Sequence, residues 1–508
     1  MSGQRQPRMN DDLKALRDRL GTVSDLSSAA NVLSWDQETY MPDGATAARA
    51  QQLATLRRLA HELFTAEETA VLLDRLSGTA GQSDDTTPEG ALVRVTRRDF
   101  ERERRIPSNL VAALAQESAL AQQAWKKARH SNAYGSFASH LERLLDLTVQ
   151  KAEAIGFDEH PYDALLDEYE PGMRTREVKA VFGDLRERLV PLVSQIAEGS
   201  QVDDGFLHRP YERSTQWEFG LAVLRDVGYD FERGRQDVSA HPFTTSFAIS
   251  DVRITTRIDE NFFPAGFFAS LHEAGHALYE QGIDPEFDRT PLADGTSLGI
   301  HESQSRLWEN MVGRSRPFWD HYFPRLRTVF PDALSDVDVE DFYRALNRVE
   351  PSLIRVEADE VTYNLHIMLR FEIELLLIEG GVSVSELPDV WNAKMEECMG
   401  LLPDSDAHGV LQDVHWSFAA FGYFPTYTLG NLMSAQLFNQ AQHDVPNLTA
   451  QIAGGRFEEL LRWLRRNVHR HGRARSAHEI MESTTGSTLS AEPWLAYVRE
   501  KWGEIYDF

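Results

Sequence analysis

Two histidines and a glutamate lie within five residues of one another in the stretch LHEAGHALYEQG, which begins at Leu271. His272 and His276 are four residues apart, so in a helix both imidazoles leave the same face. Such a pair is typical of zinc ligands, and Glu273 between them can reach the attacking water without binding the metal. The stretch predicts metal-assisted hydrolysis, unless it is an ordinary amphipathic helix that carries two histidines.

A catalytic zinc ion usually takes three protein ligands and leaves one position open, so a further ligand is needed. Glu280 continues the series, but a rise of about 1.5 Å per residue puts it about 12 Å from His272 along the helix axis, which excludes it. The segment GIHESQSRLWENMVG (299–313) follows a loop long enough to reverse the chain. It supplies Glu302 as the expected third ligand, with Glu309 as a rival two turns further along.

His301 precedes Glu302 directly, and in a helix its side chain is expected to point about 100° away from that of Glu302. We therefore interpret His301 as a group that faces the substrate or supports a ligand. An HExxH helix followed by a second helix with a glutamate ligand is the gluzincin arrangement. Tyr279 and Gly282 stand where the extended metzincin pattern needs glycine and histidine, which excludes that class.

The histidines must be carried by a helix, which we expect from about residue 262 to residue 281. Asn261 is its expected N-cap, and Gly282 stands just after its end. Apolar residues recur at helical spacing along most of the chain, so helices should dominate. The exception is HPFTTSFAISDVRITTRI (241–258), whose near period-two alternation predicts a small antiparallel sheet beside the histidine helix.

Composition narrows the classes of partner. The chain has 508 residues and a formal net charge of −27, which argues against nucleic acid and anionic membranes. Cys398 is the only cysteine, so neither an intrachain disulfide nor a cysteine-based zinc site is possible. The amino terminus lacks the apolar stretch of a secretory signal, and no apolar run reaches the roughly 18 residues that span a bilayer. We therefore expect a cytoplasmic protein.

Several short motifs along nearly the whole chain, taken together, resemble one family. They are VLSWDQETYMP from Val32, HPF from His241, DVRIT from Asp251, HEAGH from His272, HESQ from His301, IRVEAD from Ile354 and GVLQDVHW from Gly409. In this order they are similar to the motifs of the carboxypeptidase Taq family of thermostable metallocarboxypeptidases.

The resemblance implies a mainly helical fold, in which a large body is split by a deep active-site groove with a small sheet on its wall. Neurolysin-like and angiotensin-converting-enzyme-like peptidases share this architecture. We expect a single peptidase unit over residues 1–508. Residues 1–200 would form an N-terminal helical region that covers the groove, and residues 201–508 a catalytic region with the sheet and the metal-binding helices.

For the site, the resemblance implies that His272, His276 and Glu302 hold the metal and that Glu273 is the general base. It implies zinc as the cofactor, with cobalt also able to support activity. It also implies a homodimer and peptide substrates with a free C-terminus.

The oxyanion that forms during peptide hydrolysis needs a donor in addition to the metal. Tyr423 and His415 are eight residues apart on a stretch rich in glycine and aromatic residues, which resembles the oxyanion wall of related gluzincins. Tyr427 is the competing tyrosine. For any one of these tyrosines the alternative is core packing.

Recognition of a free α-carboxylate favours arginine, whose planar guanidinium binds a carboxylate through two hydrogen bonds. Arg355 in IRVEAD is the first candidate, and Arg253 in DVRIT is the second. Asp359, expected on the same helix as Arg355, is assigned to orienting a metal-bound histidine, with a plain salt bridge as the alternative. His241 either faces the substrate or caps a strand.

These residues predict a zinc metallocarboxypeptidase that removes C-terminal residues from peptides with broad specificity. One alternative is a gluzincin oligopeptidase, or a dipeptidyl carboxypeptidase, with the same metal chemistry. Another is a non-catalytic helical scaffold that binds a metal for structure. Glu273 argues against the scaffold, because a structural site needs no base.

Overall fold

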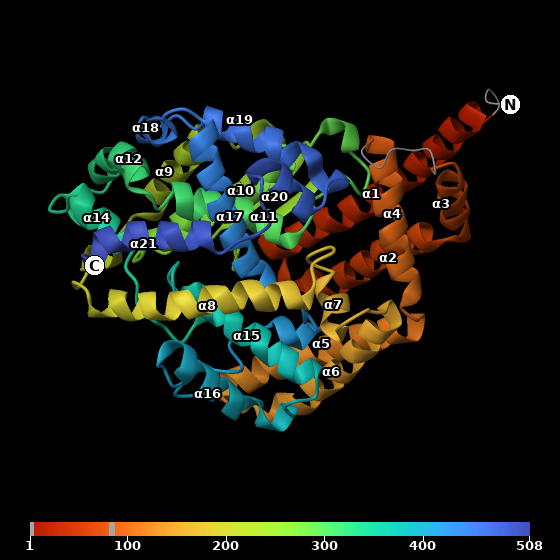
Figure 1. Ribbon diagram of the computed structural model, residues 1–508, viewed down its shortest axis with the longest axis horizontal. Coiled ribbons are helices and arrows are strands. Elements are labelled where there is room, and N and C mark those ends of the chain that lie inside the picture. Colours follow the sequence, from red (N-terminus) through yellow and green to blue (C-terminus); the bar gives the residue numbers. More distant parts are fainter. Residues whose placement is uncertain (1–4, 81–86) are drawn as a thin grey trace.

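The computed structural model describes residues 5–80 and 87–508, and helices dominate it as expected (Figure 1). The first half contains α1 (Arg5–Thr39), α2 (Thr46–Thr65), α3 (Glu67–Ala80), α4 (Pro88–Arg105), α5 (Ser108–Ser131), α6 (Gly135–Ile155), α7 (Pro161–Leu166), α8 (Thr175–Glu198) and α9 (Arg213–Asp226). In Figure 1, α8 crosses the front of the molecule between α21 and α15.

The second half holds the candidate site and most of the core. Its helices are α10 (Phe263–Gln281), α11 (Leu298–Arg306), α12 (Arg316–Val329), α13 (Pro331–Leu334), α14 (Val339–Leu346), α15 (Tyr363–Ile378), α16 (Leu387–Met399), α17 (Pro425–Asp444), α18 (Leu448–Ala453), α19 (Glu458–Asn467), α20 (Ala477–Thr485) and α21 (Glu492–Tyr506). A π-helix, η5 (Leu307–Val312), continues α11, and a 3₁₀ turn, η8 (His415–Phe418), precedes α17.

The sheet expected between residues 241 and 258 is present, but its pairing is mixed. Its strands are β1 (Gln236–Val238), β2 (Thr244–Ala248) and β3 (Asp251–Thr256), in the order β1-β3-β2 within the described residues. β2 pairs antiparallel with β3, whereas β1 pairs parallel with it. The expectation of a fully antiparallel sheet is corrected, because the short β1 lies before the segment that showed alternation.

α10, which carries both histidines, is largely enclosed by the rest of the molecule. Fourteen of its nineteen residues are buried, and the other five, Ala265, Ala269, His272, His276 and Glu280, follow one stripe at helical spacing, which carries both histidines. It packs against β3, α11 and α9. The helix begins at Phe263, and Phe262 is its N-cap without a side-chain hydrogen bond, so the expected cap at Asn261 is wrong by one residue. Asp259 accepts a bond from the Asn261 backbone instead.

Two glycines bring the neighbouring helices unusually close to the candidate site. A Cβ atom on Gly275 of α10 would lie 2.5 Å from the backbone of Gln304 and of Ser305 on α11. A Cβ on Gly430 of α17 would lie 2.6 Å from the Glu302 side chain. The glycine in HEAGH therefore has a packing reason, since α11 occupies the space of any side chain there.

The helix α1 runs from the N-terminus into the middle of the molecule and packs on the edge strand β2 (Figure 1). The Ser28 hydroxyl donates to the Phe247 carbonyl at 2.6 Å. The Arg253 guanidinium lies between the rings of Trp35 (4.5 Å) and Phe247 (4.8 Å). A cavity of about 870 Å³ lies between α1, α2, α4 and β2, so the N-terminal helices line a space that reaches Thr244.

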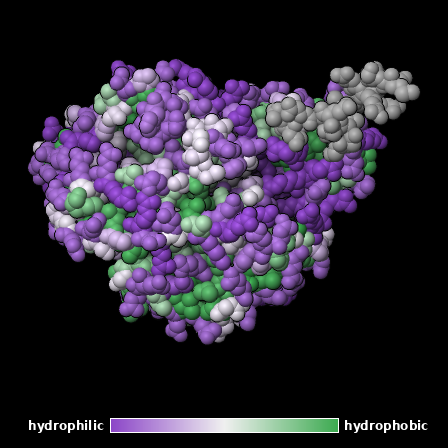
Figure 2. All heavy atoms as spheres, in the orientation of Figure 1, coloured by the Kyte–Doolittle hydropathy of each residue, from purple (hydrophilic) through white to green (hydrophobic). Residues whose placement is uncertain are grey.

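The surface agrees with the acidic composition. On the face shown in Figure 2 hydrophilic residues predominate, and the broadest hydrophobic patch lies along the lower side, in the region of α5, α6, α15 and α16. Within the described ranges, no helix has the length and the apolar character that crossing a membrane requires.

Candidate active site

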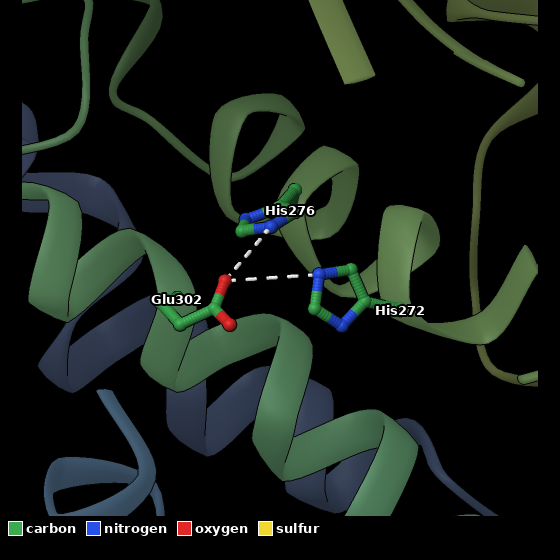
Figure 3. Close-up of side chains that lie close together, drawn as sticks. All are labelled: His272, His276 and Glu302. Atoms are coloured by element: carbon green, nitrogen blue, oxygen red, sulfur yellow. Dashed lines mark ion pairs between the residues drawn. The ribbon is translucent and has the colours of Figure 1, made fainter. Parts of the chain in front are cut away.

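His272 and His276 of α10 face Glu302 of α11 across the contact between the two helices (Figure 3). The Nε2 atom of His272 lies 3.7 Å from Oε2 of Glu302, and that of His276 lies 3.4 Å from the same oxygen. Each residue offers one ligand atom, and these atoms lie within 4.8 Å of one another. Among the described residues, this is the one group of three or more His, Cys, Asp and Glu side chains with that property.

The spacing suits a small metal ion. Two ligand atoms bonded tetrahedrally to one ion at about 2.0–2.1 Å lie roughly 3.3 Å apart. The distances from Glu302 to the two histidines are close to that value. Two imidazoles and a carboxylate are also the ligand set of catalytic zinc sites that leave a position open. The residues present therefore fit the metal that the motif predicts.

The second nitrogen of each imidazole has its own partner. Nδ1 of His272 lies 2.8 Å from Oε2 of Glu309, which makes this nitrogen a donor and leaves Nε2 free to bind metal. Nδ1 of His276 lies 2.5 Å from Nδ1 of His301, whose Nε2 lies 2.8 Å from Oε1 of Glu280. Because Glu280 accepts, His301 donates to it and accepts from His276. Both histidines thus present Nε2 to Glu302.

Glu302 is held as a carboxylate by its surroundings. Nε of Arg306 donates to its Oε1 at 2.7 Å, and Nη1 of Arg306 lies 3.3 Å from Glu309. Burial acts to raise the pKa of Glu302, but Arg306 and the two histidines outweigh it and hold the pKa well below its usual range. At Glu309 burial again acts to raise the pKa, but Arg306 and His272 outweigh it and lower the pKa to about 2. Both glutamates are therefore ionised at neutral pH.

The two histidines differ electrostatically. Burial lowers the pKa of His272, but the carboxylates of Glu302 and Glu309 outweigh this and raise it above its ordinary value. Burial also lowers the pKa of His276, and there the bond to Glu302 does not outweigh it. A cation in the position between the ligands would displace protons from both rings, because only the neutral imidazole binds metal.

Glu273 lies beside the candidate metal ligands and is oriented by the sheet. Its side chain is 7% exposed, and its Oε2 accepts from the Thr244 hydroxyl at 2.6 Å. The same hydroxyl lies 2.9 Å from the Glu273 carbonyl, so β2 fixes both ends of this residue. A carboxylate next to the ligands, with one oxygen held and the other available, suits proton transfer at the reacting centre.

An aromatic wall lies close to Glu302. The rings of His415 and Tyr423 are 5.3 Å apart, and Nε2 of His415 is 3.2 Å from the Tyr427 hydroxyl. Burial and the Glu302 charge raise the pKa of Tyr423 to about 12, so its hydroxyl stays a donor. Burial lowers the pKa of His415 to about 4, which leaves it neutral at pH 7. The structure thus groups His415 with both candidate tyrosines.

Arg355 lies in this same wall, but its guanidinium is already engaged. Nε and Nη2 donate to Oδ1 of Asp413 at 2.9 and 2.7 Å, and Nη1 donates to the Tyr363 hydroxyl at 2.9 Å. Tyr363 in turn lies under Arg306, at 4.8 Å, and so links Arg355 to the Glu302 pair. Arg355 is 6% exposed, so a substrate carboxylate would reach it only next to Asp413 and Tyr363.

Three other candidate residues have contacts elsewhere. Arg253 forms a paired hydrogen bond with Asp251 and joins the sheet to α1. His241 is exposed at the turn before β2, with its carbonyl accepting from Ser239.

Asp359 accepts from the backbone of Glu350, Val361 and Thr362 and from the Thr362 hydroxyl. It lies before α15, and not on one helix with Arg355. Its contacts correct the expectation that it orients a histidine, because they cap the turn instead.

Sequence reasoning missed three residues that the structure brings to the site. Glu309 is expected only as a rival ligand, although an acidic residue seven positions after Glu302 also suits a partner of His272. Arg306, four residues after Glu302, follows the common i,i+4 pairing of charges. Thr244 gave no signal, because its contact with Glu273 depends on how the sheet packs on α10.

The comparisons with known proteins agree over nearly the full length. The family described as Carboxypeptidase Taq (M32) metallopeptidase matches residues 15–502. Thermostable carboxypeptidase 1 of Thermus thermophilus is 45% identical over 95% of this chain and 96% of its own. Carboxypeptidase 1 of Bacillus subtilis is 37% identical over 97% and 98%. The structure of an M32 carboxypeptidase from Deinococcus radiodurans has a TM-score of 0.95 at 43% identity, over 98% of this chain and 100% of that one.

Proposed function

Since the chain belongs to the carboxypeptidase Taq (M32) family and is thereby a metallocarboxypeptidase, we propose that it uses zinc, with Glu273 as general base, to shorten peptides from their C-termini with broad specificity. The observation that carries the metal site is the approach of Nε2 of His272 and His276 to one oxygen of Glu302. Cobalt has the same ligand preferences and is the expected substitute.

The side chains of the site divide the work of peptide hydrolysis. His272, His276 and Glu302 would hold the zinc ion, which would supply a Lewis acid that makes the attacking water more acidic and polarises the scissile carbonyl. Glu273 takes the proton of that water during the attack and delivers it to the departing amine. Thr244 keeps the carboxylate of Glu273 aimed at the reacting centre through its 2.6 Å hydrogen bond.

The aromatic wall stabilises the charge that develops on the carbonyl oxygen. Tyr423 and His415 are the proposed donors, since Tyr423 feels the charge of Glu302, the His415 ring lies 5.3 Å from that of Tyr423, and both are neutral at pH 7. Tyr427 is the competing donor, and its contact with His415 places it in the same wall. Donors fixed before the reaction stabilise an oxyanion without reorganisation, which is the usual source of such rate enhancement.

Exopeptidase action requires a cation for the free C-terminal carboxylate, and Arg355 is our proposal for it. Its guanidinium lies 5.1 Å from the Tyr427 ring, within the same wall as the proposed oxyanion donors. The position of Arg253 between Trp35 and Phe247 favours a structural role for that residue.

The decisive test compares one peptide with a free C-terminus and the same peptide amidated. We expect mass spectrometry to show stepwise loss of C-terminal residues from the free peptide and no cleavage of the amidated one. Equal cleavage of both would support an oligopeptidase instead. Metal analysis of the purified protein, with zinc expected at one ion per chain, completes the test.

We also propose that the protein forms a homodimer, as the family resemblance implies, and that it works in the cytoplasm. Sedimentation velocity should give a mass twice that of the chain. We further propose that residues 1–200 cover the groove, which agrees with the packing of α1 on β2.

A further inference from the structure

A buried glutamate outside the metal site contacts the segment that carries the proposed oxyanion donors. Glu374 of α15 is fully buried and accepts three hydrogen bonds. Its Oε1 accepts from the Trp416 indole at 2.9 Å. Its Oε2 accepts from the Gly422 backbone at 3.0 Å and from the Tyr162 hydroxyl at 2.6 Å.

The two residues of this segment that donate to Glu374 are direct sequence neighbours of the proposed oxyanion donors. Trp416 follows His415, and Gly422 precedes Tyr423. One carboxylate therefore fixes both ends of the turn that runs from His415 to Tyr423. We propose that Glu374 is a positioning residue, which holds His415 and Tyr423 in the geometry that stabilises the oxyanion.

The turn has little room to settle differently. Gly422 has φ +91°, and a Cβ atom there would lie 2.8 Å from the backbone of Leu165 on α7. The Tyr423 ring also packs edge-on against Tyr169, with 5.1 Å between the ring centres. The turn is thus pressed against the α7 region on one side and tied to α15 by Glu374 on the other.

The chemistry of the contact requires a carboxylate. Each of the three partners is a donor, so the group between them must accept at both of its oxygens. A glutamine in this position offers one oxygen and one amide nitrogen. In one orientation its NH₂ group faces the Trp416 indole, and in the other it faces Tyr162 and Gly422, so a donor meets a donor in both. An unsatisfied buried donor is costly, so the turn would shift to relieve it.

This inference rests on the proposed function, in which His415 and Tyr423 face the reacting peptide bond. Glu374→Gln should therefore lower kcat about tenfold or more, since a misplaced oxyanion donor loses part of the ~10²–10³-fold that one such donor supplies. KM should change less than twofold and zinc content should stay close to that of the unmodified enzyme, whereas the thermal midpoint should fall because a buried donor loses its acceptor.

Double-mutant cycles show whether Glu374 acts through the donors. Glu374→Gln is combined with Tyr423→Phe and, separately, with His415→Asn. We expect the loss of kcat caused by Glu374→Gln to shrink clearly in at least one of these backgrounds, because the positioned group is already gone. The same fold loss in both backgrounds, or a kcat within twofold of the unmodified enzyme in the single variant, would overturn the proposal.

Two further variants keep the test decisive. Glu372→Gln is the matched control, because Glu372 lies on the same helix but pairs with Arg186 and Lys394; its kcat should be unchanged. If Glu374→Gln fails to fold, Tyr162→Phe takes its place in both double-mutant cycles, because this variant removes one hydrogen-bond partner of the Glu374 carboxylate. Cleavage of amidated peptides would refute the proposed carboxypeptidase action, whereas the cycles would still report on Glu374.

Discussion

Each imidazole of the proposed metal site is supported at its second nitrogen by a different arrangement. His272 has a carboxylate, Glu309, in direct contact, whereas His276 reaches Glu280 only through the ring of His301. A direct carboxylate makes a ligating imidazole a stronger donor to the metal than a neutral ring does. We therefore expect His272 to be more sensitive than His276 to the loss of its supporting group.

Substitution of Glu309 tests this support. Glu309→Gln removes the carboxylate charge from His272 but keeps its shape, and a lost supporting partner typically costs about 10- to 100-fold in metal affinity. Competition with a chromogenic chelator should show that loss. The exposed Glu286→Gln serves as the control, with no change expected. Unchanged affinity in Glu309→Gln would show that Glu309 does not support the ligand.

The assignment of Glu273 as the base predicts a separation of binding from turnover. Glu273→Gln should lower kcat by about 10²–10⁴-fold, which is the usual contribution of a general base. Zinc content should stay at the level of the unmodified protein, because Glu273 is not among the three ligands. Peptidase activity that survives in this variant would assign the base to another residue.

At the scale of the helices, the site exists because α10 and α11 approach closely at Gly275. An alanine there would meet the backbone of Gln304 and Ser305 at 2.5 Å, and backbone cannot move aside as a flexible side chain can. The helices would separate, and Glu302 would move away from His272 and His276. The same packing therefore sets both stability and metal affinity.

Gly275→Ala should lower both the thermal midpoint and the zinc affinity, with a loss of stability of about 1–3 kcal/mol from overpacking. The matched control is Gly183→Ala on α8, where a Cβ meets nothing within 4 Å. That variant should gain about 0.5–1 kcal/mol from helix propensity. Similar behaviour of the two variants in calorimetry and zinc titration would contradict the close-approach argument.

The helices themselves were predictable, because periodicity and Gly282 locate α10 to within one residue at each end. The distance argument that removes Glu280 as a ligand, and the return of the chain to Glu302, also needed only helical geometry. Two features lie beyond such reasoning. β1 is too short to show a pattern, and the π-helix at Leu307–Val312 changes which residues share a face with Glu302.

At the scale of the whole molecule, the segment before α8 is tied to α11, the helix that carries Glu302. The Tyr169 carbonyl accepts from the Leu298 backbone at 2.9 Å, and the Glu170 carboxylate accepts from the Gly299 backbone. Glu170 is buried, and burial raises its pKa to about 8, although the Gly299 and Ser297 bonds act to lower it. The position of Glu302 thus depends on a contact that titrates.

The sign of the pH dependence follows from that shift. The pKa of Glu170 is about 8 in the folded protein and 4.5 as the ordinary value. Its contribution to stability is therefore complete below pH 4.5 and is lost as the pH rises through 8.

We expect the thermal midpoint of the unmodified protein to decrease as the pH rises from 5 to 8. Glu170 should lower the free energy of unfolding by at most about 1.4 kcal/mol per pH unit over this range. Glu170→Gln should flatten this fall, since its amide does not titrate. Calorimetry across this range measures both. Parallel curves for the two proteins would show that Glu170 carries no such titration.

The packing of α1 on β2 bears on whether the chain aggregates while it is being synthesised. β2 is an edge strand, and an open strand edge invites pairing with another chain and aggregation. Ser28 and the Arg253 stack with Trp35 put α1 over that edge. Because α1 leaves the ribosome some 200 residues before β2, the strand meets its cover as soon as it is made. A chain that starts after α1 should aggregate while it folds.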